Sequence, residues 1–177
     1  MEHPPETLAR GAVLLRRWRA QDAAVVDRIV TEALDHLLPW MPWAAGHSAA
    51  TAAAYVAECE RQWASGEAYQ YAITCDGEEI GSCALMRRIG PGGLEIGYWL
   101  DPRWTGRGLA TTAVHALVEA ACALPGTERV EIHHDAANLA SGAVAQRAGF
   151  TEVVRLPDEG PQAPAQCGVE VIQRLSR

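Results

Sequence analysis

The chain has 177 residues, of which 49% are hydrophobic and 21% are charged, and its formal net charge at pH 7 is −7. These values fit one globular domain over residues 1–177, and the acidic charge argues against a nucleic-acid-binding surface, which needs clustered lysine and arginine. The first residues lack the basic stretch and apolar core of a secretory signal, and no apolar run reaches the roughly 18 residues of a membrane span. We therefore expect a cytoplasmic protein without a membrane anchor, in which residues 1–10 form a flexible N-terminus.

The first half of the chain combines one β-rich run with two helical patterns. Apolar side chains between Val25 and Leu34 recur with the spacing of one helix face. The predicted elements are a strand over 13–18, a helix capped by Asp22, a proline-interrupted loop over 39–43, and a helix from Thr51 to about residue 65.

The second half is richer in strands. Asp76-Gly77 between two apolar runs is a strong signal for a two-residue hairpin turn, which predicts antiparallel strands on either side. A strand, a helix and a second strand then follow, which predicts a parallel pair joined by a right-handed crossover. The predicted elements are strands over 69–75, 79–86 and 94–100, a helix over 110–123, a strand over 130–133, a helix over 140–148, strands over 150–155 and 169–175, and a mobile loop over 156–168. This is an α+β pattern, with a mixed, mostly antiparallel central sheet and helices on both faces.

The five cysteines are odd in number and widely spread, and no two of them form a C-x-x-C pair. A disulfide framework or a zinc site would need paired or closely spaced cysteines. We therefore expect no metal site, and free thiols at Cys59, Cys75, Cys83, Cys122 and Cys167.

The run Arg-Trp-Thr-Gly-Arg-Gly-Leu-Ala over 103–110 joins a predicted strand to a predicted helix. Its two glycines let the backbone approach a ligand and adopt positive φ, so that several N–H groups can point at one phosphate. The start of the helix adds unpaired amides and a positive dipole end, and the arginines add charged donors. A G-x-G pair alone is an ordinary tight turn, and Thr111 stands where the dinucleotide-binding pattern has its third glycine. The combination predicts an anion site.

The spacing of Arg103, Gly106 and Gly108 resembles the R/Q-x-x-G-x-G/A signature of the GNAT superfamily of acyl-CoA-dependent N-acetyltransferases. Four further motifs agree with its RimJ/RimL branch: LPWMPW over 38–43, GYWL over 97–100, NLAS over 138–141 and AGF over 148–150. That branch acetylates the N-termini of ribosomal proteins and has many small-molecule relatives. The resemblance extends over residues 13–175 and implies the GNAT fold.

The resemblance implies acetyl-CoA as the cosubstrate. The backbone of residues 99–101 would pair with the pantetheine arm like an added strand, the amides of residues 106–110 would hold the pyrophosphate with help from Arg103 or Arg107, and Asn138 would bind a pantetheine amide. The implied CoA-binding residues are Trp99, Leu100, Asp101, Arg103, Gly106, Arg107, Gly108, Leu109, Ala110, Asn138 and Ser141.

Ser141 is the candidate catalytic acid, because the resemblance brings it near the sulfur of the leaving thiolate. In many GNAT enzymes a tyrosine has this role, but the chain has no tyrosine after Tyr98. From spacing alone, Asn138 and Ser141 fit the N-cap of the following helix equally well.

The candidates for the base are Glu95, His133 and His134. Glu95 lies on the strand that enters the site, where a carboxylate could accept a proton directly or through water, or hold the cationic amine; the alternative is a solvated side chain on the strand face. Histidine titrates in a useful range, yet at a strand end it is more often a surface or core-edge group. Neighbours on a strand point to opposite faces, so the His-His-Asp run is a poor metal-ligand set. We take Glu95 as the candidate.

The sequence thus predicts an acetyl-CoA-dependent N-acetyltransferase that transfers the acetyl group directly to a primary amine. The acceptor is a protein N-terminal α-amine or a small-molecule amine, and the acidic field attracts such a cation. The resemblance brings Trp40, Met41 and Trp43 to the acceptor mouth. A donor with a longer acyl chain, such as succinyl-CoA, and a non-catalytic acyl-CoA-binding or sensing module remain as alternatives. The sequence is compatible with a monomer or a homodimer.

Overall fold

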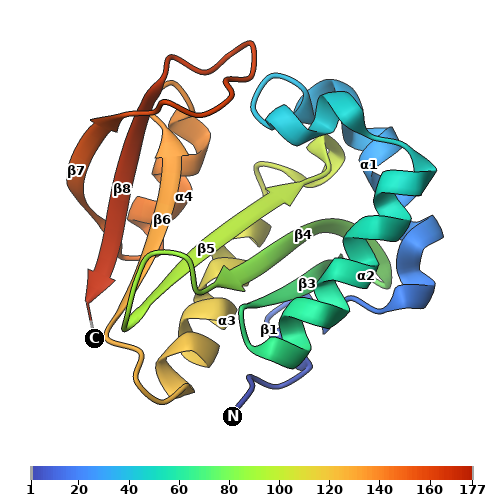
Figure 1. The fold of residues 1–177 in the computed structure, drawn as a ribbon, viewed down its shortest axis with the longest axis horizontal. Coiled ribbons are helices and arrows are strands. Elements are labelled where there is room, and N and C mark those ends of the chain that lie inside the picture. The colour runs from blue at the N-terminus through green and yellow to red at the C-terminus, as the bar shows by residue number, and fades with distance from the viewer. Residues whose placement is uncertain (1, 177) are drawn as a thin grey trace.

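A mixed sheet of eight strands runs through the molecule, with helices on both of its faces (Figure 1). The computed structural model describes residues 2–176. Neighbouring strands follow the order β1-β2-β3-β4-β5-β6-β8-β7, and every pair is antiparallel except β5 with β6. The strands are β1 (Thr7–Arg10), β2 (Val13–Arg17), β3 (Ala68–Cys75), β4 (Glu78–Met86), β5 (Gly93–Leu100), β6 (Arg129–Asp135), β7 (Thr151–Pro157) and β8 (Val169–Ser176). The helices are α1 (Ala23–Leu37), α2 (Ala49–Ser65), α3 (Leu109–Ala123) and α4 (Leu139–Arg147), with short 3-10 turns η1 (Ala20–Asp22), η2 (Pro42–Gly46) and η3 (Pro102–Trp104).

This architecture confirms the α+β class, the mostly antiparallel sheet and the single parallel pair around α3. The hairpin turn is also confirmed, because Asp76 and Gly77 both have positive φ, at +52° and +82°, as a two-residue turn of this kind requires. No helix within residues 2–176 is both long and apolar enough to cross a membrane.

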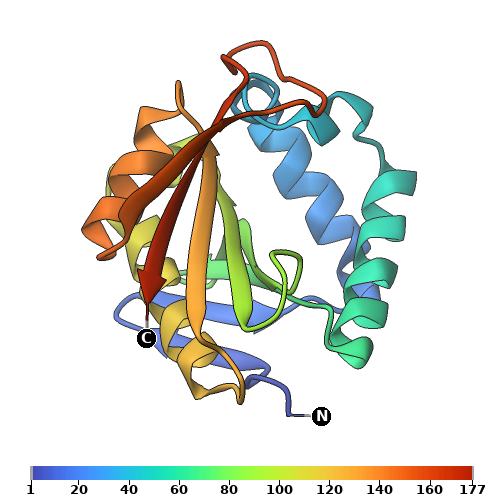
Figure 2. The same ribbon diagram turned by 60° about the vertical axis from the view of Figure 1, so that its left-hand side comes forward.

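The two faces of the sheet bury separate hydrophobic cores. The helices α1 and α2 cover one face, and α3 and α4 cover the other (Figure 2). Side chains alternate along β5, so that Leu94 and Ile96 pack in the core beneath α3, whereas Trp99 packs against the core of α1 and α2. The same alternation decides on which face each polar residue of β5 and β6 lies.

The strands β5 and β6 are paired only where they begin. Their register covers Gly93–Glu95 against Arg129–Glu131, although β5 continues to Leu100 and β6 to Asp135. Beyond this short parallel contact the strands diverge, leaving an opening in the middle of the sheet (Figure 1). The edge of β5 that faces this opening has no partner strand in the described residues.

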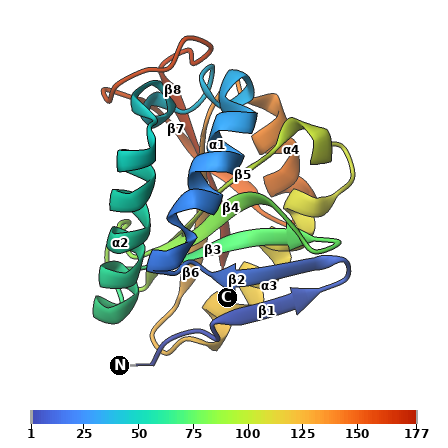
Figure 3. The same cartoon turned by 90° about the vertical axis from the view of Figure 1, so that its right-hand side faces the viewer.

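The N-terminal region departs from the sequence expectation. Residues 7–10 are not a flexible terminus: they form β1, which pairs with β2 at the edge of the sheet (Figure 3). The lead-in to β1 is also held, since Tyr71 Oη donates to Pro5 O at 2.9 Å and Arg17 N donates to Glu6 O at 2.8 Å. Four residues of weak alternation give little signal before the partner strand is known. Met1 lies outside the described residues.

The predicted N-cap position is confirmed for the first helix and corrected for the second. The helix α2 begins at Ala49 and is capped by Ser48, whose Oγ accepts from Thr51 N at 3.2 Å, while Thr51 Oγ1 accepts from Ser48 N at 2.8 Å. Thr51 is therefore the reciprocal partner in the capping box, not the cap. Asp22 stands at the N-cap position of α1, but its carboxylate accepts from Arg19 N and from Arg16, both at 2.8 Å.

The loop between β7 and β8 is tied to the sheet through the carboxylate of Asp135. This side chain is buried at the end of β6, and it accepts N–H groups from Ala137 at 2.8 Å and from Cys167 and Gly168 at 3.0 Å. Farther along the loop, Ala165 N donates to Pro39 O at 2.9 Å, so the loop also contacts the segment after α1 (Figure 2). Mobility of the remaining loop residues stays a prediction.

Asp135→Ala should destabilise the protein by about 3 kcal/mol, because it removes a charged acceptor from three N–H groups. Asp158→Ala is the matched control in the same loop, since this carboxylate accepts only from Gly160 N at 2.9 Å within residues 2–176, and it should cost less than about 1 kcal/mol. Urea denaturation followed by circular dichroism measures both values.

The contribution of Asp135 to the free energy of unfolding should depend on pH and should be lost in acid. Burial acts to raise the pKa of the Asp135 carboxyl, but hydrogen bonds from Cys167, Ala137 and Gly168 outweigh it and lower that pKa below its ordinary value. Its contribution is therefore complete above the ordinary aspartate pKa of about 3.9 and is lost as the pH falls through the lowered value. The stability gap between wild type and Asp135→Ala should narrow in strong acid, and a gap that widens there would contradict this assignment.

Candidate active site

The turn after β5 presents an open group of backbone amides. Gly106 and Gly108 have φ of +74° and +76°, the left-handed conformation that favours glycine, and a Cβ added to either would meet no atom within 4 Å. Helix α3 starts directly after Gly108, and no side chain within residues 2–176 caps its N-terminus. The first N–H groups of this helix have no partner within it, because the first bond back to Gly108 O comes from Thr112 N, at 3.0 Å. The geometry is that of an anion site at a helix N-terminus.

The two arginines of this turn are in different environments. Arg103 is bound to carboxylates, with Nη2 at 2.6 Å from Asp101 Oδ2 and at 2.7 Å from Glu32 Oε2. The guanidinium of Arg107 lies over the Trp104 ring, 4.8 Å from its centroid, and pairs with no carboxylate in residues 2–176. Arg107 is therefore the arginine whose charge is available to an anion.

The end of β5 offers backbone groups to the opening. Trp99 and Leu100 pair with Ser82 and Gly81 of β4 on one side, and their other edge faces the gap toward β6. Asp101 offers no free backbone group to the opening, because its N–H donates to Ile80 O at 2.8 Å and its carbonyl accepts from Trp104 N at 2.9 Å. Its buried carboxyl is bound by Arg103, which lowers the pKa of Asp101.

Asn138 and Ser141, at the start of α4, make different contacts. Asn138 Oδ1 accepts from Ser141 N at 3.1 Å, so the capping interpretation holds for Asn138. Ser141 Oγ lies 2.9 Å from Tyr98 Oη, a contact that links α4 to β5. Burial raises the pKa of Tyr98. A tyrosine therefore stands beside the candidate serine after all, and it comes from the strand before the glycine turn, where strand alternation brings it to the same face as α4.

Glu95 lies where β5 and β6 begin to separate. Its side chain is only 6% exposed, and both carboxylate oxygens are bound by Arg88, with Arg88 Nε at 2.7 Å from Oε2 and Nη2 in contact with Oε1. The interpretation as a solvated strand-face residue is therefore wrong. Alternation along β5 turns Glu95 toward the face covered by α1 and α2.

A chain of ionisable side chains lies on the same face of β6 and β8. Glu131 is buried and accepts from Arg174 Nε at 2.8 Å and from Arg129 Nε at 3.2 Å. His133 Nε2 lies 2.9 Å from Glu131 Oε2, and His133 Nδ1 lies 3.2 Å from Glu170 Oε1. Burial acts to raise the pKa of Glu131, but hydrogen bonds from His133 and Arg174 lower it overall.

These ionisable side chains border a cavity of about 350 Å³ on the α1 and α2 side of the opening. Carboxylates supply four of the lining residues, so an entering cation would find a favourable charge. The lining residues are Arg88, Ile89, Glu95, His133, His134, Asp135, Asp158, Gln166 and Glu170. Neither Arg88 nor Glu170 was predicted from the sequence. For Glu170 the reason is that only the register of β8 against β6 brings it to His133.

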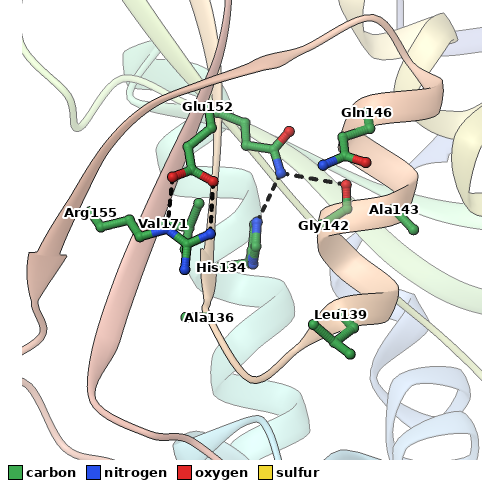
Figure 4. Close-up of a pocket in the computed structure, with 10 residues that line it drawn as sticks. His134, Ala136, Leu139, Gly142, Ala143, Gln146, Glu152, Arg155 and Val171 are labelled. Atoms are coloured by element: carbon green, nitrogen blue, oxygen red, sulfur yellow. Dashed lines mark hydrogen bonds and ion pairs between the residues drawn. The ribbon is translucent and has the colours of Figure 1, made fainter.

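A second cavity of about 210 Å³ lies between α4, β7 and β8 (Figure 4). His134 faces it, with Nε2 at 3.0 Å from Gln173 Nε2 and Nδ1 at 2.9 Å from Asp135 O. Gln173 in turn donates to Gly142 O at 3.4 Å. These contacts give His134 a packing role on the α4 side, opposite to the side of His133.

The tryptophan loop contacts the end of β5 rather than the acidic cavity. Trp43 in η2 is 48% exposed, and its ring centroid lies 6.4 Å from that of Trp99. Met41 packs against the core of α1 and α2. None of Trp40, Met41 and Trp43 is among the residues that line the cavity.

Comparison with known proteins gives a family. Residues 12–151 match the model of the acetyltransferase (GNAT) domain family. No curated protein matches the chain by sequence. Among solved structures, the RimL ribosomal L7/L12 α-N-protein acetyltransferase in complex with coenzyme A superposes with a TM-score of 0.88 at 22% identity, over 97% of this chain and 98% of that one.

Two further structures have the same fold. Mycobacterium smegmatis RimJ, in complex with CoA-disulfide, has a TM-score of 0.87 at 25% identity, over 99% of this chain and 90% of its own. The microcin C7 self-immunity acetyltransferase MccE, in complex with acetyl-CoA and AMP, has a TM-score of 0.85 at 18% identity, over 94% and 93% of the two chains. Since the domain model covers most of the sequence and the fold agrees throughout, the chain belongs to the GNAT acetyltransferase family.

Proposed function

We propose that this protein transfers the acetyl group of acetyl-CoA to a primary amine, and that the amine is the N-terminal α-amine of a protein. The observation that carries the proposal is the opening between β5 and β6, which has an anion-binding turn at the end of β5 and an acidic cavity against one face. RimL and RimJ, whose folds this chain shares, support the choice of a protein acceptor, because RimL is described as an α-N-protein acetyltransferase.

The residues present fit the proposed cosubstrate. The empty space before Gly106 and Gly108, the uncapped start of α3 and the unpaired charge of Arg107 suit a pyrophosphate. The free edge of β5 at Trp99 and Leu100 suits the amides of a pantetheine arm, which can pair with it as a strand would. When bound, acetyl-CoA supplies the thioester whose acyl carbon the amine attacks.

The face covered by α4 supplies the proton donor in this proposal. Ser141 Oγ and Tyr98 Oη form a pair of hydroxyls beside the opening, 2.9 Å apart. We assign the acid role to Ser141, with Tyr98 holding its hydroxyl in place. A proton delivered there stabilises the departing thiolate.

The opposite face receives the amine. An α-amine with a pKa near 8 is roughly 10% neutral at pH 7, whereas a lysine side chain is only about 0.04% neutral, so an α-amine needs less help to lose its proton. Glu95 contributes negative charge to the cavity, and Arg88 holds that carboxylate in position. A small-molecule amine is the second candidate, because about 350 Å³ lies within the range of ligand pockets.

An acceptor screen tests the function directly. The protein is incubated with acetyl-CoA and peptides with free N-termini, the same peptides with blocked N-termini, and small amines including a polyamine. Free-thiol release and mass spectrometry should show one added acetyl group on peptides with a free α-amine and none on the blocked controls. CoA binding without thiol release for any amine would overturn the enzyme proposal in favour of a sensing module, and turnover with succinyl-CoA alone would overturn the choice of donor.

Gly108→Ala should weaken CoA binding at least about tenfold, because its Cβ would occupy the space proposed for phosphate. Gly126→Ala is the matched control: Gly126 has φ of +73° and equally empty surroundings, but lies in the turn between α3 and β6. Both variants should lose similar stability, about 1 kcal/mol, from alanine in a left-handed conformation. Calorimetric titration that finds equal CoA affinity for the two variants would contradict the phosphate cradle.

Ser141→Ala should lower kcat about 10²-fold with little change in CoA affinity, because the hydroxyl is lost and the cap from Asn138 to the backbone N–H of residue 141 is kept. Asn138→Ala is the capping comparison and should cost about 1 kcal/mol of stability. Steady-state kinetics and thermal melts separate the two effects. If Tyr98→Phe lowers kcat more than Ser141→Ala does, the acid is the tyrosine.

A further inference from the structure

We propose that Glu170, His133 and Glu131 form a proton-accepting chain on the acceptor side of the opening, in which Glu170 contacts the amine and His133 takes its proton. This proposal rests on the proposed function, since it names the groups that prepare the amine for acetyl transfer. It assigns the base to residues on β6 and β8 rather than to Glu95 on β5.

His133 lies between two carboxylates, and its hydrogen-bonding capacity determines what it can do there. A carboxylate oxygen lies near each of its ring nitrogens, with Glu131 Oε2 at 2.9 Å from Nε2 and Glu170 Oε1 at 3.2 Å from Nδ1. A neutral imidazole has one N–H group and one lone pair. When its N–H donates to Glu131, the lone pair on Nδ1 faces a carboxylate oxygen of Glu170 that is also an acceptor. One proton placed between these two atoms turns a repulsive contact into a hydrogen bond.

Glu131 orients the ring and does not itself contact the amine. Its side chain is 4% exposed, and besides His133 it binds Arg129 and Arg174. These arginines neutralise the buried carboxylate, so it remains an acceptor for His133 Nε2 and leaves Nδ1 directed at Glu170. A buried carboxylate that holds the far nitrogen of a histidine is the usual way to fix the ring of a catalytic base.

Glu170 is better placed than Glu95 to meet an ammonium group. Both line the same cavity, but the Glu170 side chain is 35% exposed and its Oε2 has no hydrogen-bond partner within residues 2–176. The Glu95 side chain is 6% exposed, and Arg88 binds both of its oxygens. An entering cation therefore reaches a free carboxylate oxygen at Glu170, whereas at Glu95 it must displace a guanidinium.

The proton steps balance. The ammonium group gives one proton to the Glu170 and His133 pair, and the neutral amine then forms a bond to the acyl carbon of the thioester. The carbon–sulfur bond breaks as the sulfur takes a proton from the Ser141 hydroxyl. The nitrogen loses its second proton, which returns to Ser141 and restores that hydroxyl. The products are an amide, a thiol and one proton, which the exposed Glu170 returns to water.

Charged and titratable groups from every neighbouring element lie around the Glu170, His133 and Glu131 side chains. On β6 and β8, Glu131 and Arg174 lie beside His133, and Arg88 from the segment before β5 faces Glu170. The full set around the cavity and the chain is Arg88, Glu95, Arg129, Glu131, His134, Asp135, Asp158, Glu170 and Arg174.

The test compares Glu170→Gln and His133→Gln with Glu119→Gln, an exposed carboxylate on α3 that pairs with Arg10, as the control. At pH 7, kcat/KM for a peptide α-amine should fall about 10²-fold in both chain variants and stay unchanged in the control. The deficit should shrink to a few-fold at a pH above the pKa of the amine, where the acceptor is already neutral. Affinity for CoA should equal that of the wild type throughout, which shows that the variants are folded.

A deficit of the same size at every pH would overturn the proposal, because it would indicate a structural role. A second contradicting result would be that the fall in kcat/KM at low pH disappears in Glu95→Gln but persists in Glu170→Gln. It would overturn the proposal and assign the base to Glu95 on β5. If the wild-type protein acetylates no amine, the proposed function fails first. The contacts of the proton-accepting chain are then still tested by nitrogen NMR of the His133 ring, whose Nδ1 and Nε2 chemical shifts must change in Glu170→Gln and Glu131→Gln if these contacts exist.

Discussion

The short parallel contact between β5 and β6 determines where an opening forms in the sheet. Only Gly93–Glu95 and Arg129–Glu131 are paired, and beyond them each strand turns an unpaired edge toward the other. In a closed sheet these backbone groups would satisfy one another, whereas here they are left for water or a ligand. The same separation brings the start of α3, the start of α4 and the acidic cavity to the margins of one opening, and these are the elements of the proposed acyl-transfer site.

Buried carboxylates lie along the opening, two where β5 and β6 part and one at the end of β6, and each is bound by a different kind of partner. Glu95 is bound by Arg88, Glu131 by two arginines and a histidine, and Asp135 by backbone N–H groups. Removing one partner from a buried ion pair costs about 3–5 kcal/mol, because the other charge remains without water. These contacts therefore stabilise one geometry of the opening while keeping negative charge close to it. Glu170 is the exception, since it retains exposure and a free oxygen.

Local signals in the sequence predicted the elements well, and long-range pairings limited the rest. The hairpin at Asp76-Gly77, the glycine turn and the parallel pair around α3 follow from spacing alone. The strand β1 could not be predicted in this way, because its four residues are recognisable as a strand only once they pair with β2. The Glu170 contact with His133 could not be predicted either, since it depends on the register of β8 against β6 across 37 positions of the chain. A sequence pattern shows which residues alternate on one strand, but not which strand lies beside it.

Strand alternation explains why the proposed acid and the proposed base lie on opposite faces of the same opening. On β5, Tyr98 lies on the α4 side with Ser141, whereas Glu95 lies on the α1 and α2 side. On β6, His134 and His133 divide in the same way, one toward Gln173 beneath α4 and the other toward the acidic cavity. In the proposed site, the donor and the acceptor therefore approach the opening from opposite faces of the sheet, and the two-residue period of the β-strands sets which face each group occupies.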